Sequence, residues 1–254
     1  MTYIIDAVRT PIGNFGGTLK NIRTDDLAAI PIRELIKRTN IDPKKIDDVI
    51  LGCANQAGED NRNVARMASL LAGIPYTVPG ETVNRLCASG MSAVIHAHRA
   101  ASSKDGNLFI SGGVENMTRG PWVISKVSKA FGRDAQMHDS SFGWRFINPK
   151  MKELYGTDGM GQTAENLAEK YNITREDQDL FAFNSQRKAS RAQERGRFKD
   201  EIVSVKIPQR KGDPIIFDKD EFIRSNTSTE VLAKLKPAFK KNGTVTAGNA
   251  SGLN

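Results

Sequence analysis

The most informative stretch of the chain is Asn84-Arg85-Leu86-Cys87-Ala88-Ser89-Gly90-Met91, in which a cysteine stands between two predicted elements. The apolar residues before it predict a strand over Val83–Leu86. Ser89 is predicted to cap a helix that continues to about Ser103, and the many small side chains of this helix favour close packing. A strand that leads directly into a helix is typical of an α/β layered domain.

Cys87 is a candidate nucleophile on physical grounds. The positive end of a helix dipole favours the thiolate form of a cysteine that lies beside it. Backbone N–H groups at the same place can stabilise the oxyanion that forms when a thiolate attacks a carbonyl. The position therefore suits acyl transfer, although a buried structural cysteine at a strand end explains the residues alone equally well. Cys53, which follows an apolar strand, is predicted to be buried and unreactive, so iodoacetamide should label Cys87 first.

Strand-like and helix-like segments alternate along the first 120 residues, which predicts an α/β domain. The predicted elements here are a strand at Tyr3–Val8, a helix from Thr24 to about Arg38, a strand at Asp48–Cys53, a helix at Asn63–Leu71 and a strand at Asn107–Ser111. Later we expect helices at Thr163–Tyr171, Thr174–Arg195 and near Glu230–Leu235, and a strand at Ile202–Ile207. The predicted domain limits are 1–118, 119–246 and 247–254.

The composition is that of an ordinary globular protein. Of the 254 residues, 39% are hydrophobic and 26% are charged, which excludes a disordered or collagen-like chain. No stretch approaches the roughly 18 apolar residues of a membrane span, and the first residues lack the features of a signal peptide. Two cysteines exclude a disulfide framework and a four-cysteine zinc site, so we predict no metal and a reducing, cytoplasmic setting.

The net charge of +8 lies mainly in the second half of the chain. Residues 1–120 hold 14 basic and 12 acidic residues, a net +2, and residues 121–254 hold 23 and 17, a net +6. A basic surface can attract nucleic acid or a phosphorylated small molecule. The chain has no zinc-finger or helix-turn-helix signature and no basic run that alternates with aromatic residues. We therefore expect a phosphorylated small molecule and no nucleic acid.

The sequence resembles the thiolase family over its whole length. Residues 84–91 resemble the segment that carries the acyl-enzyme cysteine of that family. Further segments that carry the resemblance are Asp6–Gly13, Gly112-Gly113-Val114-Glu115-Asn116-Met117, Met160–Asn166, Ser185–Ala189, Lys236-Pro237-Ala238-Phe239 and Gly243–Leu253. The resemblance implies a thiolase-like α/β layered fold. It would comprise a first core domain, with a mixed sheet and helices, and an α/β loop domain, without the second core domain.

The resemblance also implies a mechanism and a set of site residues. Cys87 would accept an acyl group from coenzyme A, with its own N–H in the oxyanion hole, and no cofactor would be bound covalently. The loop domain would bind coenzyme A or acyl-CoA as the substrate. The positions that match family contacts to that molecule are Arg224, Ala247, Ala250, Ser251 and Met160. On the residues alone, Arg224 is equally a solvated surface arginine, and residues 248–252 are equally a plain turn.

Some family features are absent from these 254 residues. The Gly-His-Pro, Cys-x-Gly-Gly-Gly and Asn-Glu-Ala-Phe segments do not occur, so the general base and second cysteine are missing. His96, His98 and His138 are expected to be structural or surface residues. We therefore expect a truncated chain, a partner polypeptide or a self-associating piece, with the apolar face of the Cys87 helix partly uncovered. Alone, this chain should not thiolyse acetoacetyl-CoA.

The choice of acyl substrate rests on two further segments. Residues 141–149 and 55–66 look most like thiolases of aromatic-compound degradation, which cleave 3-oxoadipyl-CoA, and Arg145 could face a distal carboxylate. Gly159 stands where many biosynthetic members have a histidine. The alternatives are a biosynthetic acetoacetyl-CoA thiolase, a sterol-carrier-like or condensing relative, and a non-catalytic fragment that binds coenzyme A or a partner. When complete, the enzyme is expected to be a homo-oligomer, a dimer or a tetramer.

Overall fold

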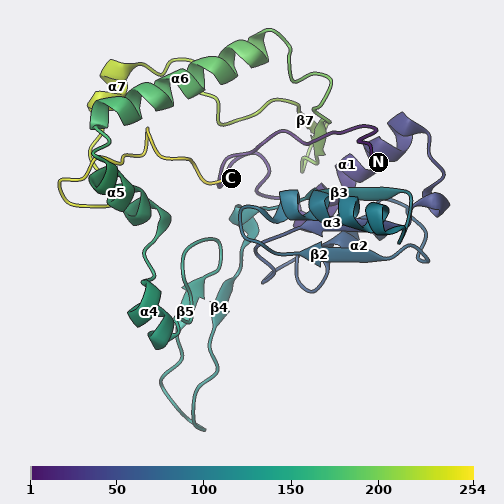
Figure 1. The fold of residues 1–254 in the computed structure, drawn as a ribbon, viewed down its shortest axis with the longest axis horizontal. Helices are drawn as coiled ribbons and strands as arrows, with labels where there is room; N and C mark the ends of the chain where they lie inside the picture. Colours follow the sequence, from purple (N-terminus) through teal and green to yellow (C-terminus); the bar gives the residue numbers. More distant parts are fainter. Residues whose placement is uncertain (1) are drawn as a thin grey trace. The chain divides into compact units, whose positions relative to one another are not determined.

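The computed structural model describes residues 2–254, which divide into two compact units (Figure 1). The first unit extends to Pro121 and also includes Lys199–Glu221 and Asn254. The second consists of Trp122–Phe198 and Phe222–Leu253. The chain therefore returns to its first unit after entering the second. The sequence-based domain limits 1–118, 119–246 and 247–254 stay predictions.

The helices and strands of each unit follow in chain order. The first unit contains α1 (Thr24–Thr39), the 3₁₀ helix η1 (Pro43–Lys45), β1 (Asp48–Gly52), α2 (Val64–Leu71), β2 (Gly80–Val83), α3 (Ser89–Ser103), β3 (Phe109–Gly113), the 3₁₀ helix η2 (Met117–Arg119), β6 (Val205–Ile207) and β7 (Ile215–Phe217). The second contains β4 (Trp122–Ile124), β5 (Met137–Asp139), α4 (Pro149–Tyr155), α5 (Met160–Tyr171), α6 (Arg175–Glu194) and α7 (Thr229–Ala233). The predicted α/β class is confirmed.

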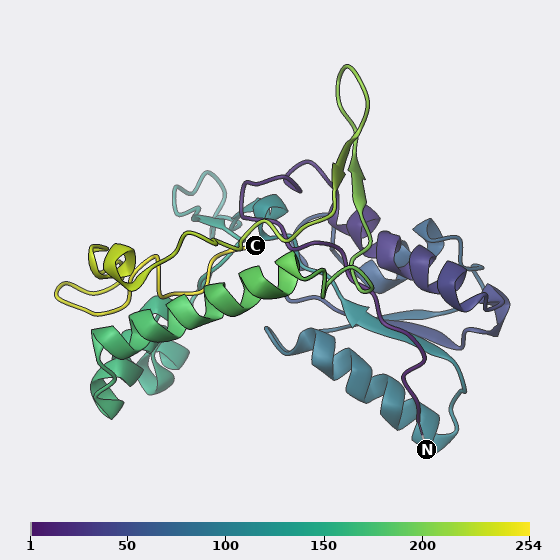
Figure 2. The same ribbon diagram turned by 90° about the horizontal axis from the view of Figure 1, so that it is seen from above.

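The first unit is built around a parallel sheet of order β2-β1-β3. Val49 and Leu51 on one face of β1 join a core cluster with residues of α1 and α2, whereas Ile50 on the other face packs with Ala93 and Ala97 of α3. Figure 2 shows α1 and α3 on opposite sides of the strands. Because side chains alternate between the faces of a strand, a central strand covered on both sides is expected to be apolar on both faces, as Val49, Ile50 and Leu51 of β1 are.

Glycine is required where α3 begins beside the ends of β1 and β3. A β carbon on Gly52 would lie 2.2 Å from the carbonyl carbon of Ser89 and 2.4 Å from the nitrogen of Gly90. A β carbon on Gly113 would lie 2.9 Å from the carbonyl oxygen of Gly52. All of these atoms belong to the backbone, so side-chain rotation cannot relieve the contact. The glycines therefore place the N-terminus of α3 directly against the strand ends.

Several predicted elements have different bounds in the structure. Tyr3–Val8 is not a strand, because these residues have no partner edge, and a single bridge joins Arg9 to Ile202. The strand predicted at Val83–Leu86 is β2, which ends at Val83 because the chain turns at the next residues. The remaining predicted elements differ from the observed ones at their ends, for example α5, which begins three residues earlier than expected.

The sequence suggests caps at Thr24, Ser89 and Thr174, and only the cap at Thr174 is confirmed. Thr174 Oγ1 accepts a hydrogen bond from the Asp177 N–H. Asn63, which the sequence places inside a helix, caps α2 through the Arg66 N–H. Thr24 lies inside the first turn of α1, where its N–H donates to Glu59. Ser89 is the first residue of α3, and its hydroxyl serves the preceding turn instead. A hydroxyl at the start of a helix can therefore bind another backbone group nearby instead of capping the helix.

Ionic hydrogen bonds attach the returning segment to the start of the chain within the first unit. Arg9 donates two hydrogen bonds to Asp220, at 2.7 and 2.9 Å, and one of 2.8 Å to Glu201. The Ile12 N–H also donates to Asp220. Burial alone would raise the pKa of Asp220, but the bonds from Arg9 and Ile12 outweigh it, so this pKa lies below its ordinary value. Asp220 therefore stabilises the fold as a carboxylate.

Replacement Asp220→Asn is expected to destabilise the first unit by about 1–3 kcal/mol at pH 7. Because the folded-state pKa of Asp220 is depressed, its contribution is complete above about pH 5 and is lost as the pH falls through the folded-state pKa. The difference in urea stability between wild type and variant should thus shrink as the pH falls through the folded-state pKa of Asp220, which lies below its ordinary value. Asp218→Asn, at an exposed neighbouring position, is the control. A stability difference that persists unchanged in acid would contradict this account.

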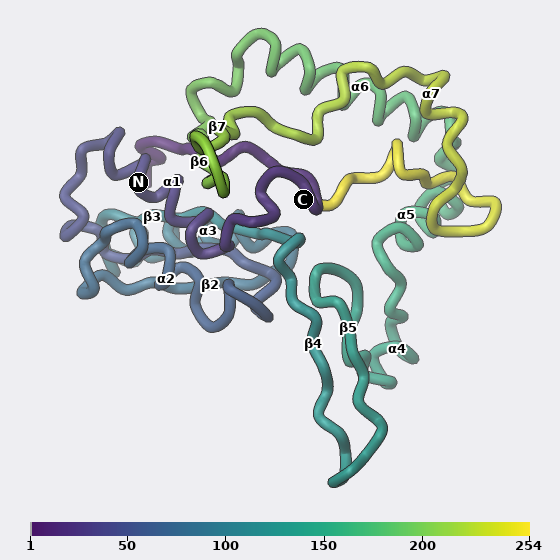
Figure 3. The backbone as a smooth tube through the Cα atoms, turned by 180° about the vertical axis from the view of Figure 1, so that it is seen from behind, coloured from purple at the N-terminus to yellow at the C-terminus, as the bar shows by residue number. Residues whose placement is uncertain are grey.

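The second unit is organised around α5 and α6. Figure 3 shows the last part of the chain, in yellow, passing α5 and the end of α6. Glu165 of α5 is only 3% exposed and accepts hydrogen bonds from the N–H groups of Thr244 and Val245. This carboxylate therefore ties the returning strand-like segment to the helix. Within the described residues, no helix combines the length and apolar character that a membrane crossing requires.

Candidate active site

Cys87 lies in the first unit, in the turn between β2 and α3. Its side chain is exposed, and it precedes Ala88, the residue that caps α3. The N–H groups of Ala88 and Ser89 donate to the carbonyl oxygens of Arg85 and Leu86, at 3.1 and 3.0 Å. These two donors are thus engaged in the turn. The arrangement presents a thiol at the start of a helix, as the sequence predicts.

The turn that carries Cys87 is held by two side chains. Ser89 Oγ accepts a hydrogen bond from the Arg85 N–H at 2.8 Å and donates one to the Leu86 carbonyl at 2.6 Å. Asn84 Oδ1 accepts from the Leu86 N–H at 2.9 Å. Leu86 itself has a φ of 49°, in the left-handed region that non-glycine residues rarely occupy. The nucleophile candidate therefore sits on a strained turn with a defined hydrogen-bond pattern.

The helix that follows Cys87 leaves an apolar strip uncovered. Met91, Val94 and Ile95 of α3 are exposed, although the opposite face of the same helix packs on the sheet. Each square ångström of apolar surface left in water forgoes about 25 cal/mol of stabilisation. This exposure is what the sequence led us to expect. The identity of whatever covers the strip stays a prediction.

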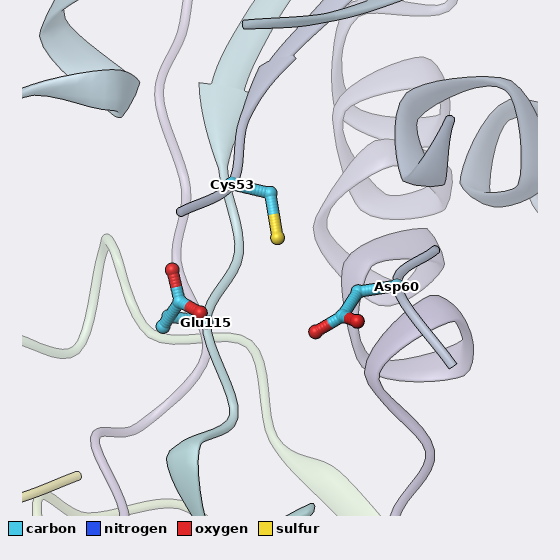
Figure 4. A group of neighbouring side chains, drawn as sticks. All are labelled: Cys53, Asp60 and Glu115. Carbon is cyan, nitrogen blue, oxygen red and sulfur yellow. The ribbon is translucent and has the colours of Figure 1, made fainter. Parts of the chain in front are cut away.

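Cys53 and Asp60 are buried and lie close to the carboxylate of Glu115, whose residue is exposed as a whole. The Cys53 sulfur and the carboxylate oxygens of Asp60 and Glu115 lie within 4.8 Å of one another (Figure 4). Burial raises the pKa of the Cys53 thiol, and the nearby negative charges of Glu115 and Asp60 raise it further. The thiol therefore keeps its proton and donates to the carbonyl oxygen of Asn55 at 3.0 Å. Through this hydrogen bond, Cys53 braces the loop that follows β1.

The positions predicted to contact pantetheine lie on a turn of the second unit. Ala247, Ala250 and Ser251 follow the buried Thr246, and the Ala250 N–H donates to the Thr246 carbonyl at 3.0 Å. Asn249 holds this turn, because its Oδ1 accepts from the Thr246 N–H and its Nδ2 donates to Asp179 of α6. Residues 246–250 are therefore a braced turn and not a free strand start.

Two more predicted positions lie on the same unit. The guanidinium of Arg224 is 5.8 Å from the centre of the Phe222 ring, and Gly252 lies against the same ring. Phe222 thus brings Arg224 close to the stretch that contains Ser251. Met160 is exposed at the start of α5, where a β carbon on Gly161 would overlap the ring of Phe239. The structure gives no placement of these residues relative to Cys87, because they lie in different units.

The three histidines lie on regular elements of the two units. His96 and His98 lie within α3, and His98 Nδ1 is 3.1 Å from Thr2 Oγ1. His138 was expected in an irregular segment but lies in β5, where its ring meets Phe146 edge to face at 4.8 Å between centroids. His96 and His138 are half-buried and His98 is exposed, and their role as structural or surface residues stays a prediction.

Reasoning from sequence did not single out the acidic residues that hold the two loops. Glu115 accepts from the Ala54 and Asn55 N–H groups, and Glu165 accepts from Thr244 and Val245. Both glutamates lie inside segments that carry the thiolase resemblance. Their place in these segments could have marked the two glutamates as functional residues. It does not reveal which N–H groups a glutamate will bind.

Comparisons with known proteins give the family of the chain. The family described as "Thiolase, N-terminal domain" matches residues 2–254. A beta-ketoadipyl-CoA thiolase of Acinetobacter baylyi is 56% identical over 99% of this chain and 63% of its own length. A 3-oxoadipyl-CoA/3-oxo-5,6-dehydrosuberyl-CoA thiolase of Escherichia coli is 54% identical over the same shares. The chain therefore spans less than two thirds of the relatives it matches.

A solved structure shows the same fold. The crystal structure of the Bacillus anthracis acetyl-CoA acetyltransferase matches with a TM-score of 0.85 and 42% identity, covering 98% of this chain and 61% of that one. The family match spans nearly every residue, and the cysteine turn, the glycines beside it and the parallel sheet form one coherent unit. The sequence, the fold and the relatives agree, and the chain belongs to the thiolase family, whose N-terminal domain it comprises.

Proposed function

We propose that this chain supplies the acyl-accepting cysteine of a thiolase. The Cys87 thiolate attacks the thioester carbonyl of an acyl-CoA, and the resulting oxyanion is stabilised by the N–H of Cys87. When this intermediate collapses, the new bond from Cys87 to the acyl carbon remains and the bond to the coenzyme A sulfur breaks. Coenzyme A leaves as the thiolate and takes up a proton. The observation that carries this proposal is an exposed thiol immediately before the first turn of α3.

Coenzyme A is proposed to bind to the second unit. Arg224 would attract a phosphate group of the nucleotide, and the braced turn with Ala247, Ala250 and Ser251 would contact the pantetheine arm. Met160 would lie near the thioester. Support comes from the second unit's net charge of +7, from 18 basic and 11 acidic residues, and from the shared Phe222 contact of Arg224 and Gly252. No metal or covalently bound cofactor has a part in this chemistry.

The proposed reaction of the complete protein is thiolytic cleavage of 3-oxoadipyl-CoA to succinyl-CoA and acetyl-CoA, in a cytoplasmic homo-oligomer. The names of two relatives that are more than half identical to this chain support the substrate class. A fragment that binds coenzyme A or a partner without turnover is the second candidate, favoured by the uncovered strip on α3. Because the chain contains no Cys-x-Gly-Gly-Gly segment, we expect it alone not to thiolyse acetoacetyl-CoA above background.

Incubation of the 254-residue chain with acetyl-CoA is expected to add one acetyl group on Cys87. The measurement is an intact mass followed by peptide mapping. Cys87→Ser should reduce loading to background, because an unactivated hydroxyl is not ionised near neutral pH as a thiolate is. Cys53, which is buried in the same chain, is the internal control of the peptide map and should stay unmodified. Loading that survives Cys87→Ser, or that maps to Cys53, would refute the proposed nucleophile.

A further inference from the structure

We propose that Glu115 and Asn84 are positioning residues that set the Cys87 turn through a chain of hydrogen bonds passing Ala54. This inference rests on the proposed role of Cys87 as the nucleophile and adds residues that do not touch the acyl group. This series of hydrogen bonds begins at Glu115, in the loop after β3, and ends at the N–H of Leu86, the residue before Cys87. All of its members belong to the first unit.

The first link joins Glu115 to the loop that follows β1. One carboxylate oxygen accepts from the Ala54 N–H at 2.9 Å, and the other accepts from the Asn55 N–H at 3.1 Å. The residue is exposed as a whole, but its carboxylate is turned toward Cys53 (Figure 4). Two consecutive N–H groups bound by one carboxylate have little freedom to rotate. Glu115 therefore fixes the orientation of the backbone at Ala54.

The second link passes from this loop to the strand end that precedes Cys87. The Nδ2 of Asn84 donates to the carbonyl oxygen of Ala54 at 3.1 Å. Asn84 follows β2, whereas Ala54 follows β1, and the two strands are parallel neighbours. The amide of Asn84 is thus held by a backbone group that Glu115 has already oriented.

The third link reaches the turn itself. Asn84 Oδ1 accepts from the Leu86 N–H at 2.9 Å, while Leu86 adopts the left-handed φ of 49°. Packing does not hold Leu86 in this conformation, because its side chain is 72% exposed. Hydrogen bonds must do so, and the side chains that provide them are Asn84 and Ser89. Asn84 is the one of these two that connects the turn to Glu115.

Cys53 supports the same loop from the inside. Its thiol donates to the carbonyl oxygen of Asn55, the residue whose N–H is bound by Glu115. Burial and the neighbouring carboxylates keep this thiol protonated, so the donor is maintained at neutral pH. Cys53 also provides an internal reference for the test below, because it is 1% exposed and is alkylated only when the first unit opens.

The test measures the iodoacetamide alkylation rates of Cys87 and Cys53 in the same sample, by peptide mass mapping from pH 6 to pH 9. Asn84→Ala removes both of its hydrogen bonds. Asn84→Asp keeps the acceptor for Leu86 but loses the donor to Ala54. Both variants are expected to slow the alkylation of Cys87 about five- to tenfold, because each loses one or two hydrogen bonds. The pH–rate profile of this alkylation should also move to higher pH. Cys53 should stay at its slow wild-type rate.

Glu115 is tested by graded replacement. Glu115→Ala should slow Cys87 as much as Asn84→Ala does, and Glu115→Gln, which retains one acceptor oxygen, should fall between it and wild type. Combining Glu115→Ala with Asn84→Asp should give no further slowing, because both variants interrupt one chain. Glu81→Gln, which removes an exposed carboxylate on β2, is the matched control and should leave both rates unchanged.

Three results would overturn the inference. Wild-type behaviour of Asn84→Asp would mean that only the local turn matters. Additive effects of the Glu115 and Asn84 variants would mean that they act independently. A parallel rise in Cys53 alkylation in the Asn84 variants, which leave the groups beside the Cys53 thiol intact, would mean that they destabilise the whole unit. Failure of the wild-type chain to take up acetyl on Cys87 would refute the proposed function. The alkylation rates are measured without acyl-CoA, so they would still show whether Glu115 and Asn84 position the Cys87 turn.

Discussion

The replacement Gly52→Ala is expected to lower the stability of the first unit by about 3 kcal/mol or more, which corresponds to a fall in Tm of roughly 6–12 °C. The new β carbon would lie 2.2 to 2.5 Å from the backbone of Ser89 and Gly90. Neither strand β1 nor helix α3 can yield by rotating a side chain, so one of them must shift. Because native domains are stable by only about 5–15 kcal/mol, this is a large fraction of the total.

The matched control is Gly112→Ala on the adjacent strand β3. A β carbon there would have Leu51 Cδ2 as its nearest contact at 3.9 Å, an ordinary van der Waals distance. Its effect should be small and of either sign. Thermal unfolding followed by circular dichroism compares the two variants. We further expect Gly52→Ala to reduce acetyl loading, since the displaced helix carries the cysteine turn with it. Equal melting of the two variants would show that α3 does not contact the end of β1.

Replacement Glu165→Ala is expected to destabilise the second unit by about 3 kcal/mol or more. The carboxylate accepts from the Thr244 N–H at 2.9 and 3.0 Å and from the Val245 N–H at 2.8 Å. Val245 is itself buried, so its N–H would have no water to replace the lost partner. A buried N–H left without an acceptor costs about 1–3 kcal/mol, and hydrogen bonds to a charged group are stronger than average. The lost side-chain volume adds a cavity.

The control for Glu165 lies one turn further along the same helix. Glu169 pairs with Lys240 at 2.7 Å, but its side chain is 73% exposed, so Glu169→Ala should leave stability almost unchanged. Hydrogen exchange of residues 243–250 is the second measurement, because Glu165→Ala should release this turn selectively. If the proposed coenzyme A site is right, Glu165→Ala should also lower the affinity for coenzyme A. Similar behaviour of the two variants would contradict a bracing role for Glu165.

Local sequence patterns predicted a helix or strand well where its formation depends only on residues within one short segment. The apolar run of β1, the acidic start of α1 and the Thr174 cap of α6 each depend on neighbours within a few residues. Tyr3–Val8 failed as a strand because a strand needs a partner edge, which no property of the segment itself supplies. Ser89 failed as a cap because the Arg85 N–H and the Leu86 carbonyl bind its hydroxyl.

The sequence by itself determined the thiolase family, the candidate nucleophile Cys87 and the predicted coenzyme A positions, because these depend on the order and identity of residues within short motifs. Only the tertiary structure decided which groups hold those motifs in place. Glu115 meets Ala54 across 61 residues, and Glu165 meets Val245 across 80. Such contacts exist only after the strands and helices have packed, since a hydrogen bond requires its two atoms within about 3 Å regardless of their separation along the chain.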